Sequence, residues 1–350
     1  MAGVKSKVRV FFAAALVPTR YIGDMQLFLR TILVLACLTL TGVLRSAEGA
    51  RVISFHGFYD CIELKNKTTR VVLCPAVGGR VLEFSIQGKN ALWLNPEEVG
   101  KTNGTSAGRF DIGPERILPP HNVLFRGQYK GEIVGVRSAK LTSGRDASSG
   151  FQIVREFSLA TDTAHLICKQ TVINISKGKR QVCYWCRTFA LGQGICVVPV
   201  SGFSRMPKRH VMYDDHLVIN FAAENDNITE RGGCIIVDGP PEKPKLGFDS
   251  MSGWLAYLMR NDLMFIKKWP TYPDRVYGEM ASLTLSIWYP AERPMCELEP
   301  IGPREILKPG QRASFTEEWF LSPYKFPGSG PKVNLSTVKT ISQKLMAPAK

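Results

Sequence analysis

The sequence predicts an all-β protein built as one large sandwich. Short apolar stretches rich in Val, Ile and aromatic residues follow one another from Phe55 onward, and turns of Gly, Asn, Pro and Lys separate them. Convincing amphipathic helical patterns are missing before the C-terminal segment. Many short strands at this spacing are typical of a β-sandwich or barrel, and a single domain of this class often exceeds about 200 residues.

The apolar stretches assign the strands in chain order. The first strands form hairpins, because Asn66-Lys67 and residues 87–90 (QGKN) have the residue types of tight turns. A helical pattern occurs at residues 335–346, near the C-terminus. The predicted strands cover residues 61–65, 69–74, 80–86, 91–94, 132–141, 151–159, 164–174, 181–190, 217–221, 233–237, 254–260, 263–269, 282–289, 295–299 and 313–321.

Composition divides the chain into three parts. Residues 1–50 contain a charge-free apolar run at 31–44, with basic residues before it and small residues after it, which is the pattern of a secretory signal peptide. The run is short for a membrane span, which needs about 20 residues. Residues 51–324 form the predicted sandwich domain, and residues 325–350 are expected to be a flexible basic tail. We therefore expect a secreted or periplasmic protein, which would contact a membrane only if its N-terminal segment is not cleaved.

The chain is basic. It has 45 Lys and Arg against 30 Asp and Glu, a net charge of +15, and removal of residues 1–50 leaves 39 against 28. A basic exported protein could meet an anionic polymer, a membrane surface or nucleic acid. There is no long Lys/Arg run and no nucleic-acid-binding motif, so we expect no nucleic-acid partner. An anionic glycan is one interpretation of the charge, and a basic surface without a specific partner is the other.

Most of the cysteines are expected to be buried free thiols. Cys37 lies in the apolar run, and the other eight lie largely in strand-like stretches, where a thiol behaves as a small hydrophobic group. Their even number would also permit disulfides after export. Cys183 and Cys186 form a CxxC pair, but on a strand they would point to opposite faces, which argues against a shared metal or a disulfide.

Two neighbouring acids are the strongest candidates for chemistry. Glu297 and Glu299 lie in residues 295–300 (MCELEP), two positions apart on one predicted strand, so both project from the same face. Like charges side by side repel, so either this face of the strand is exposed to solvent or the pair has a function. Carboxylates at this spacing suit both retaining and inverting glycosidases, and the spacing does not choose between them.

Arginine and aromatic residues supply candidate sugar-binding groups. Residues 108–117 (GRFDIGPERI) have the composition of a loop and contain the candidate sugar-binding residues Arg109, Asp111 and Arg116. Arg109 could form bidentate hydrogen bonds to hydroxyls or a carboxylate. Trp185 and Arg187 share one face of a predicted strand. An indole beside a guanidinium suits a pyranose, which has apolar faces and hydroxyl edges. Internal packing and internal ion pairing are the alternatives for both groups.

His121 is the best placed of the five histidines, because it follows the arginine-rich segment. It is either a general acid or an ordinary loop residue. No pair of histidines has the spacing of a helical zinc site, and no nucleophile elbow or P-loop is present. The sequence therefore predicts neither a metal nor a cofactor.

The order of several short segments resembles the galactose mutarotase-like (aldose 1-epimerase-like) superfamily, and specifically a poorly characterised bacterial branch of it. The resemblance spans residues 57–323 and implies a β-supersandwich with a concave sugar-binding face. It rests on the opening hairpin, the sugar-contacting arginine segment, the glutamate strand and the closing strand, at residues 75–90 (PAVGGRVLEFSIQGKN), 108–117, 296–299 (CELE), 307–310 (LKPG) and 315–320 (FTEEWF).

The same resemblance implies roles for individual residues. Glu297 matches the general base of the superfamily, and Glu299 matches a neighbouring polar position. The two histidines of the superfamily have no match, because Phe125 stands at the first position and the strand at 181–191 has no histidine. His121 is close to the first position. Mutarotation needs an acid and a base together, and loss of one such group typically costs about 10²–10⁴-fold in rate.

Three functions follow from these observations. The favoured one is an exported carbohydrate-binding protein, with acidic glycans as ligands that would suit the positive charge. The alternative is a sugar-active enzyme, either an aldose 1-epimerase-like isomerase or a glycoside hydrolase, with Glu297 as general base. The third is a structural module of the cell envelope. A fold of this kind does not by itself fix the function.

Overall fold

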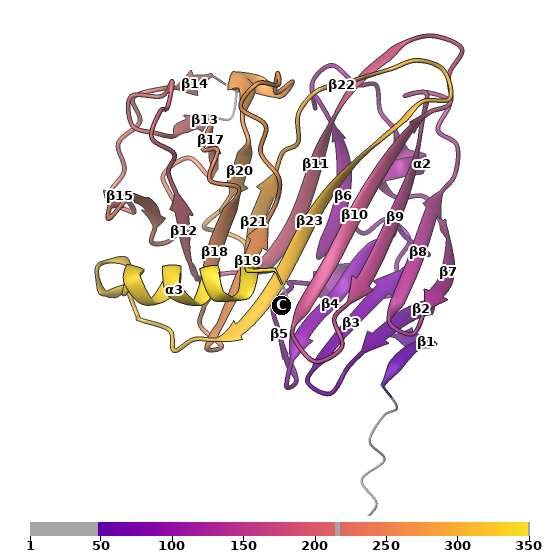
Figure 1. The fold of residues 1–350 in the computed structure, drawn as a ribbon, viewed down its shortest axis with the longest axis horizontal. Helices are drawn as coiled ribbons and strands as arrows, with labels where there is room; N and C mark the ends of the chain where they lie inside the picture. Colours follow the sequence, from indigo (N-terminus) through magenta and orange to yellow (C-terminus); the bar gives the residue numbers. More distant parts are fainter. Residues whose placement is uncertain (1–47, 214–217, 349–350) are drawn as a thin grey trace, which may run out of the picture. The chain divides into compact units, whose positions relative to one another are not determined.

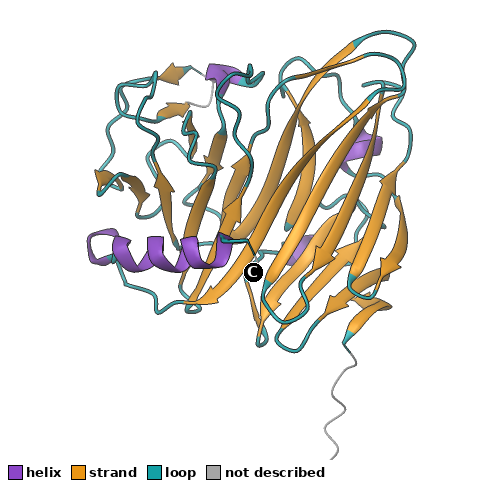
Figure 2. Ribbon diagram, in the orientation of Figure 1, coloured by secondary structure: helices purple, strands orange, loops and turns teal. Residues whose placement is uncertain are grey.

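Two antiparallel β-sheets make up most of the described chain, which covers residues 48–213 and 218–348 of a computed structural model (Figures 1 and 2). The prediction of an all-β sandwich is confirmed. Nearly all of the predicted leader, residues 1–47, lies outside the described residues. Within the described ranges, no helix has the length and apolar character that crossing a membrane requires.

Sheet A has thirteen strands in the described chain, in the order β1-β2-β3-β4-β6-β11-β21-β20-β17-β13-β14, with β5 beside β4 and β22 beside β11. Its strands are β1 (Gly49–Phe55), β2 (Phe58–Lys65), β3 (Thr69–Cys74), β4 (Arg80–Ile86), β5 (Lys89–Asn90), β6 (Gly108–Gly113), β11 (Arg180–Leu191), β13 (Val211–Tyr213), β14 (Ile219–Asn220), β17 (Lys245–Phe248), β20 (Leu285–Trp288), β21 (Met295–Pro300) and β22 (Glu305–Leu307).

Sheet B has ten strands in the described chain, in the order β15-β16-β12-β18-β19-β23-β10-β9-β8-β7. Its strands are β7 (Tyr129–Gly135), β8 (Ser138–Ser143), β9 (Phe151–Leu159), β10 (His165–Asn174), β12 (Ile195–Pro199), β15 (Ile228–Arg231), β16 (Cys234–Val237), β18 (Trp254–Met259), β19 (Leu263–Lys268) and β23 (Arg312–Pro323). The helical segments are η1 (Pro96–Glu98), α2 (Asn122–Phe125), η2 (Met280–Ser282), η3 (Gly330–Lys332) and α3 (Leu335–Met346).

The inner faces of the two sheets pack around Trp319 of β23. This ring is fully buried, and its centroid lies 6.0 Å from that of Phe84 in sheet A and 5.5 Å from that of Phe265 in sheet B. Strand β9 alternates buried and more exposed positions, as expected for a strand with one covered face. Strand β21 is buried at every position, so both of its faces are covered.

A buried ion pair lies between the sheets. Lys267 of β19 and Glu317 of β23 are both fully buried, with Nζ 2.9 Å from Oε2. The Lys267 ammonium also donates to Thr188 Oγ1 at 2.9 Å and to the Leu298 carbonyl at 3.2 Å, both in sheet A. Because an uncompensated charge in a core is strongly destabilising, each partner depends on the other.

The segment around Arg109 corrects a prediction. It was expected to be a loop, but residues Gly108–Gly113 form β6, a central strand between β4 and β11. A Cβ atom at Gly108 would lie 2.6 Å from the Trp319 ring, so glycine is required there by close packing rather than by a turn. The predicted strand at 91–94 is reduced to one bridge, between Leu92 and Ala190.

The C-terminal segment corrects a second prediction. Residues 325–350 were expected to be a flexible tail, but α3 packs on the outer face of sheet B (Figure 1). Leu335 and Val338 are buried there, and Ile341 and Leu345 complete the apolar stripe of the helix. The helical pattern was visible in the sequence, but the surrounding Pro, Gly and Lys residues gave no indication that the helix would pack against sheet B.

The eight cysteines of the described residues are buried free thiols, as predicted. Cys183 and Cys186 point to opposite sides of β11. Cys183 faces Gly113 across the outer side of the sheet, whereas Cys186 faces the core beside Glu317. The CxxC pair therefore has no shared ligand geometry.

Candidate functional site

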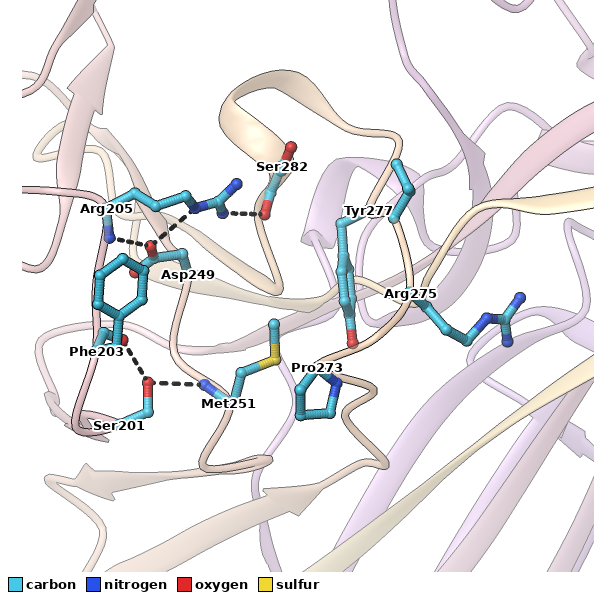
Figure 3. A pocket seen from close by; sticks show the side chains of 10 residues that line it. Ser201, Phe203, Arg205, Asp249, Met251, Pro273, Arg275, Tyr277 and Ser282 are labelled. Carbon is cyan, nitrogen blue, oxygen red and sulfur yellow. Dashed lines mark hydrogen bonds and ion pairs between the residues drawn. The ribbon is translucent and has the colours of Figure 1, made fainter.

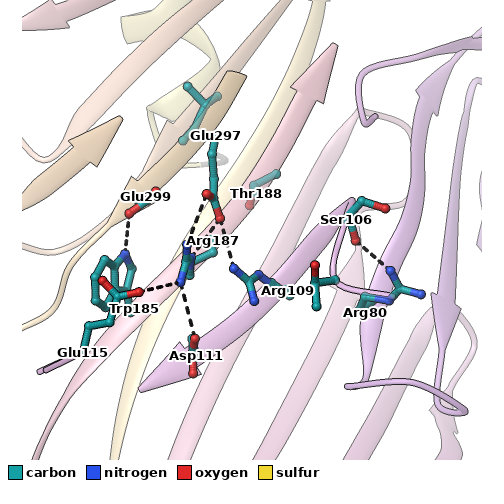
Figure 4. A network of polar contacts seen from close by, with 12 residues as sticks. Arg80, Ser106, Arg109, Asp111, Glu115, Trp185, Arg187, Thr188, Glu297 and Glu299 are labelled. Carbon is teal, nitrogen blue, oxygen red and sulfur yellow. Dashed lines mark hydrogen bonds and ion pairs between the residues drawn. The ribbon is translucent and has the colours of Figure 1, made fainter. Parts of the chain in front are cut away.

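Three neighbouring strands bring most of the predicted site residues together on one face of sheet A (Figure 4). β11 pairs with β6 on one side, so that Arg187 lies opposite Arg109, and with β21 on the other, which carries Glu297. The opposite face of β11 carries Thr188, which contacts Lys267 of sheet B. The face that carries Arg187 is therefore the outer face of sheet A.

Arg187 and Glu297 form the centre of the site. Arg187 Nε donates to Glu297 Oε1 at 2.8 Å, and Nη2 donates to Oε2 at 3.3 Å. Arg109 Nη2 donates to the same Oε1 at 3.5 Å. Burial of Glu297 favours its neutral form, but the charges of Arg187 and Arg109 outweigh burial and lower its pKa to about 2. The carboxylate is thus ionised at neutral pH and is a weak proton acceptor.

Arg109 is buried between aromatic rings. Its Cζ lies 4.3 Å from the ring centroid of Phe125 and 5.7 Å from that of Phe189. Phe125 stands where the family resemblance led us to expect a histidine. Burial and the charge of Arg187 lower the pKa of Arg109 to about 10. Its Nε and Nη1 have no hydrogen-bond partner among the described residues, so Arg109 retains unused donors.

His121 and Asp111 form a second ion pair beside β6. His121 Nε2 lies 2.8 Å from Asp111 Oδ1, and Nδ1 lies 2.8 Å from the Pro119 carbonyl. Burial of His121 favours the neutral ring, but the hydrogen bond and charge of Asp111 outweigh burial and raise its pKa. With acceptors at both ring nitrogens, the protonated imidazolium satisfies both contacts.

Glu299 has different partners from Glu297. Trp185 Nε1 donates to Glu299 Oε2 at 2.7 Å, and Lys245 Nζ of β17 donates to the same oxygen at 3.2 Å. Burial raises the pKa of Glu299, against the charge of Lys245, and the nearby Glu297 carboxylate raises it further. The two glutamates tolerate their proximity because each has its own cation.

Two predicted sugar-binding residues lie differently from expectation. Trp185 is only 2% exposed, with its indole N–H bound to Glu299 and the cations of Arg187 and Lys245 at 5.1 and 4.8 Å from its ring. It supports these cations and does not offer an open ring face. Arg116 is exposed on the turn after β6, outside the group of ion-paired residues.

Eight side chains form what we call the ion network. Glu115, which the sequence analysis did not single out, joins it through Arg187 Nη1, which lies 3.5 Å from Glu115 Oε1 and 3.6 Å from Asp111 Oδ2. The network contains four acidic and four basic groups: Asp111, Glu115, Glu297, Glu299, Arg109, His121, Arg187 and Lys245. In the described ranges, no group of His, Cys, Asp and Glu has the geometry of a metal site.

Three aromatic residues, which we call the aromatic cluster, border the ion network. Trp93 and Phe189 meet edge to face with ring centroids 6.1 Å apart, and Phe189 meets Trp288 in the same way at 6.2 Å. Phe189 and Trp288 are the cross-strand neighbours of Glu297 on β11 and β20. Both indoles are half-buried, and the guanidinium carbon of Arg293 lies 5.2 Å from the ring centroid of Trp288. Trp93 and Trp288 are therefore more exposed than Trp185, although Arg293 covers one side of the Trp288 ring.

Solved structures decide the fold. No protein-family model matches the chain, and no curated protein matches its sequence. The Slr1438 protein of Synechocystis sp. PCC 6803 is similar at 14% identity and a TM-score of 0.55, over 79% of this chain and 98% of that one. Galactose mutarotase-like proteins from Lactobacillus casei and Clostridium acetobutylicum are similar at TM-scores of 0.53 and 0.54, each at 10% identity, over 75% and 78% of this chain and 100% and 98% of theirs.

The chain has the galactose mutarotase-like fold. The resemblance read from the sequence is thus confirmed for the fold, while identities this low leave the function to the site itself. Within this mutarotase-like fold, Glu297 pairs with Arg187 and Arg109, and no histidine contacts it among the described residues. Arg187 stands on the strand of the second expected histidine, and Phe125 replaces the first.

Proposed function

We propose that the chain is a carbohydrate-binding protein that holds a sugar on the outer face of sheet A and does not transform it. The observation that carries the proposal is the aromatic cluster beside two partly exposed cations. Trp93 and Trp288 are partly open to solvent, and Arg187 and Lys245 are 12% and 20% exposed at the same face. A pyranose has apolar C–H faces that pack on indoles and hydroxyl edges that accept from such donors.

The geometry argues against proton-transfer chemistry. A general base must reach the proton that it removes, but Glu297 is fully buried and both of its oxygens bind arginine. Its pKa of about 2 makes it a poor acceptor at neutral pH. His121 is held at both nitrogens by Asp111 and Pro119. The enzyme alternative, with Glu297 as base, is therefore not favoured.

The numbers of acidic and basic groups in the ion network indicate which ligand charge suits the site. Four acidic and four basic groups leave no net charge when all eight are ionised, so the local field does not select an anion. We favour a neutral sugar at this face. The acidic glycan that the net charge of +15 suggests would be attracted by the whole chain and not by this site. Export stays part of the proposal and rests on residues 1–50 alone.

A glycan array tests the proposal, followed by NMR exchange of free aldose anomers with the same protein. We expect binding to a neutral glycan and no acceleration of anomer exchange. Trp93→Ala and Trp288→Ala should each abolish or strongly weaken binding, because each removes part of the open ring surface. Tyr59→Ala is the matched control, since Tyr59 is 72% exposed on β2 and lies outside the ion network and the aromatic cluster. Accelerated anomer exchange that Glu297→Gln abolishes would replace the proposal with the enzyme alternative.

A further inference from the structure

A second candidate site lies in the loops after β12, β17 and β19 (Figure 3). These loops line an open cavity of about 510 Å³, a volume within the usual range for small-molecule sites. Phe203 comes from the first loop, Met251 from the second, and Pro273 and Tyr277 from the third. None of these residues belongs to the ion network or the aromatic cluster.

The walls of this cavity are aromatic and apolar. Phe203 is 78% exposed, an unusual degree for a large apolar side chain, and it stands across the cavity from Tyr277 in Figure 3. Met251 and Pro273 add apolar lining between them. The Tyr277 hydroxyl accepts from the backbone N–H of Tyr272 at 3.0 Å, so its own proton is available to a bound hydroxyl.

Arg205 fixes the polar side of the cavity. Its backbone N–H and its Nε donate to Asp249 Oδ2, at 2.8 and 3.3 Å. Its Nη2 donates to the Ser282 carbonyl at 3.0 Å and the Ala281 carbonyl at 3.4 Å. Asp249 is 5% exposed and also accepts from Ser204 Oγ at 2.7 Å. The rim is therefore held in place before any ligand arrives, which lowers the entropic cost of binding.

The backbone held by Arg205 is strained. Ala281 and Ser282 have φ values of 54° and 52°, in the left-handed region that side-chain-bearing residues rarely adopt. Two such residues in succession persist only where the surroundings enforce them, and such positions cluster at ligand sites. Here the strain coincides with a cavity and with an exposed aromatic wall.

We propose that this cavity is a second carbohydrate site, which takes one pyranose ring against the exposed ring of Phe203, with Tyr277, 4% exposed, in the opposite wall. One apolar face of the sugar would pack on the Phe203 ring, and its hydroxyls would meet Tyr277 Oη and the polar rim. Asp249, the only acid among the lining residues, is paired with Arg205, and the second lining arginine, Arg275, is paired with Glu305 at 2.8 Å. Because these charges are compensated, a neutral sugar fits best.

The same loop connects the cavity to the ion network. Glu279, two residues after Tyr277, accepts from the backbone N–H of Glu115 at 3.0 Å, and Glu115 lies beside Arg187. The third loop thus has the cavity on one side and the ion network on the other. One oligosaccharide that reaches both sites would gain affinity from each. The choice of a sugar as ligand rests on the proposed function, whereas the cavity and its strained rim do not.

Calorimetric titration of Phe203→Ala tests the proposal, with a panel of neutral tetrasaccharides (gluco-, galacto-, manno- and xylo-) and with uronate and sulfated counterparts. Since Phe203 is exposed, the variant should fold as the wild type does, which an unchanged melting temperature would verify. We expect about tenfold weaker binding of the best neutral ligand. Phe221→Ala, which removes an exposed phenylalanine away from the cavity, should bind like the wild type.

Parallel titration of Trp288→Ala separates the two proposals. If Phe203→Ala retains wild-type affinity while Trp288→Ala loses it, the second site is refuted and the proposed function stands. If Phe203→Ala alone weakens binding, the cavity is a site and the outer face of sheet A is not. Binding restricted to the uronate or sulfated sugars overturns the neutral-sugar assignment, and no binding of any sugar by the wild type overturns both sites.

Discussion

The guanidinium of Arg187 is 12% exposed, while the Glu297 carboxylate that it chelates at 2.8 and 3.3 Å is fully buried. The arginine is thus the member of this pair that a ligand can reach. The buried carboxylate of Glu297 holds the side chains of Arg187 and Arg109 in position. This relationship gives Glu297 the role of positioning the arginines that a ligand would contact, whereas the family resemblance implied that Glu297 is a general base.

Glu297→Gln is expected to destabilise the fold by about 3–5 kcal/mol, because two buried or half-buried guanidinium groups lose their counter-charge. Urea unfolding of the variant and the wild type measures the difference. Glu115→Gln is the matched control, since Glu115 is 41% exposed and 3.5 Å from Arg187, and its loss should cost less than about 1 kcal/mol. An equal loss of stability in the two variants would refute the anchoring role.

His121 should titrate above its ordinary pKa of 6.5, because Asp111 stabilises the imidazolium more than burial opposes it. NMR titration of the imidazole signals measures this pKa, and Asp111→Asn should lower it. The stabilisation from this pair is fully present below about pH 6.5 and is lost as the pH rises through the raised pKa. His121→Gln should therefore lower the melting temperature more at pH 6 than at pH 9.

His210 should show a lowered pKa in the same NMR titration, in contrast to the raised pKa of His121. Burial lowers its pKa below 6.5, and its Nε2 is buried without a hydrogen-bond partner among the described residues. Its contribution to stability is present above about pH 6.5 and is lost as the pH falls through the lowered pKa. If His121 and His210 titrate together near 6.5, neither environment is as described.

The buried pair of Lys267 and Glu317 should show strong coupling. Lys267→Met alone leaves Glu317 buried without its cation, and Glu317→Leu alone leaves Lys267 without its anion, so each should cost about 3–5 kcal/mol. The double variant should recover most of the loss, because both charges leave the core together. Denaturant unfolding of all four proteins gives the coupling energy, and additive losses would show that the pair does not interact.

Docking of α3 makes a distinct prediction. Val338→Asp places a charge in the apolar contact between α3 and sheet B, where Val338 is fully buried, and should cost about 3 kcal/mol or more. Thr340→Asp introduces the same charge at an exposed position of the same helix and should change stability by less than about 0.5 kcal/mol. Thermal unfolding compares the two, and equal melting temperatures would mean that α3 does not hold to the sheet.

Periodicity and turn chemistry predicted the fold class and most strands, because those signals are local. The loop assigned to residues 108–117 failed because the need for Gly108 comes from Trp319, more than 200 positions later in the chain. Strand alternation placed Glu297 with Glu299 and Trp185 with Arg187, but it did not predict that Glu297, Arg187 and Arg109 would converge and pair. The register between β6, β11 and β21, which brings them together, is set by tertiary contacts.

The aromatic cluster shows a signal that the sequence did contain. The hairpin between predicted strands 282–289 and 295–299 could have placed Trp288 beside Glu297, as it does in the structure. Trp93 offered no such signal, because it reaches the cluster through a backbone hydrogen bond to Phe189, nearly 100 residues away. Trp185 looked like the open ring from alternation alone, which gives the face of a residue but not its burial.

The most direct test of the central claim is the affinity of a Trp93→Ala/Trp288→Ala double variant for the neutral glycan that the wild type binds best. Calorimetric titration at equal melting temperatures would isolate the effect on the site. If the outer face of sheet A is a sugar-binding surface, the double variant should lose at least about tenfold in affinity. Unchanged affinity in the double variant would contradict the account.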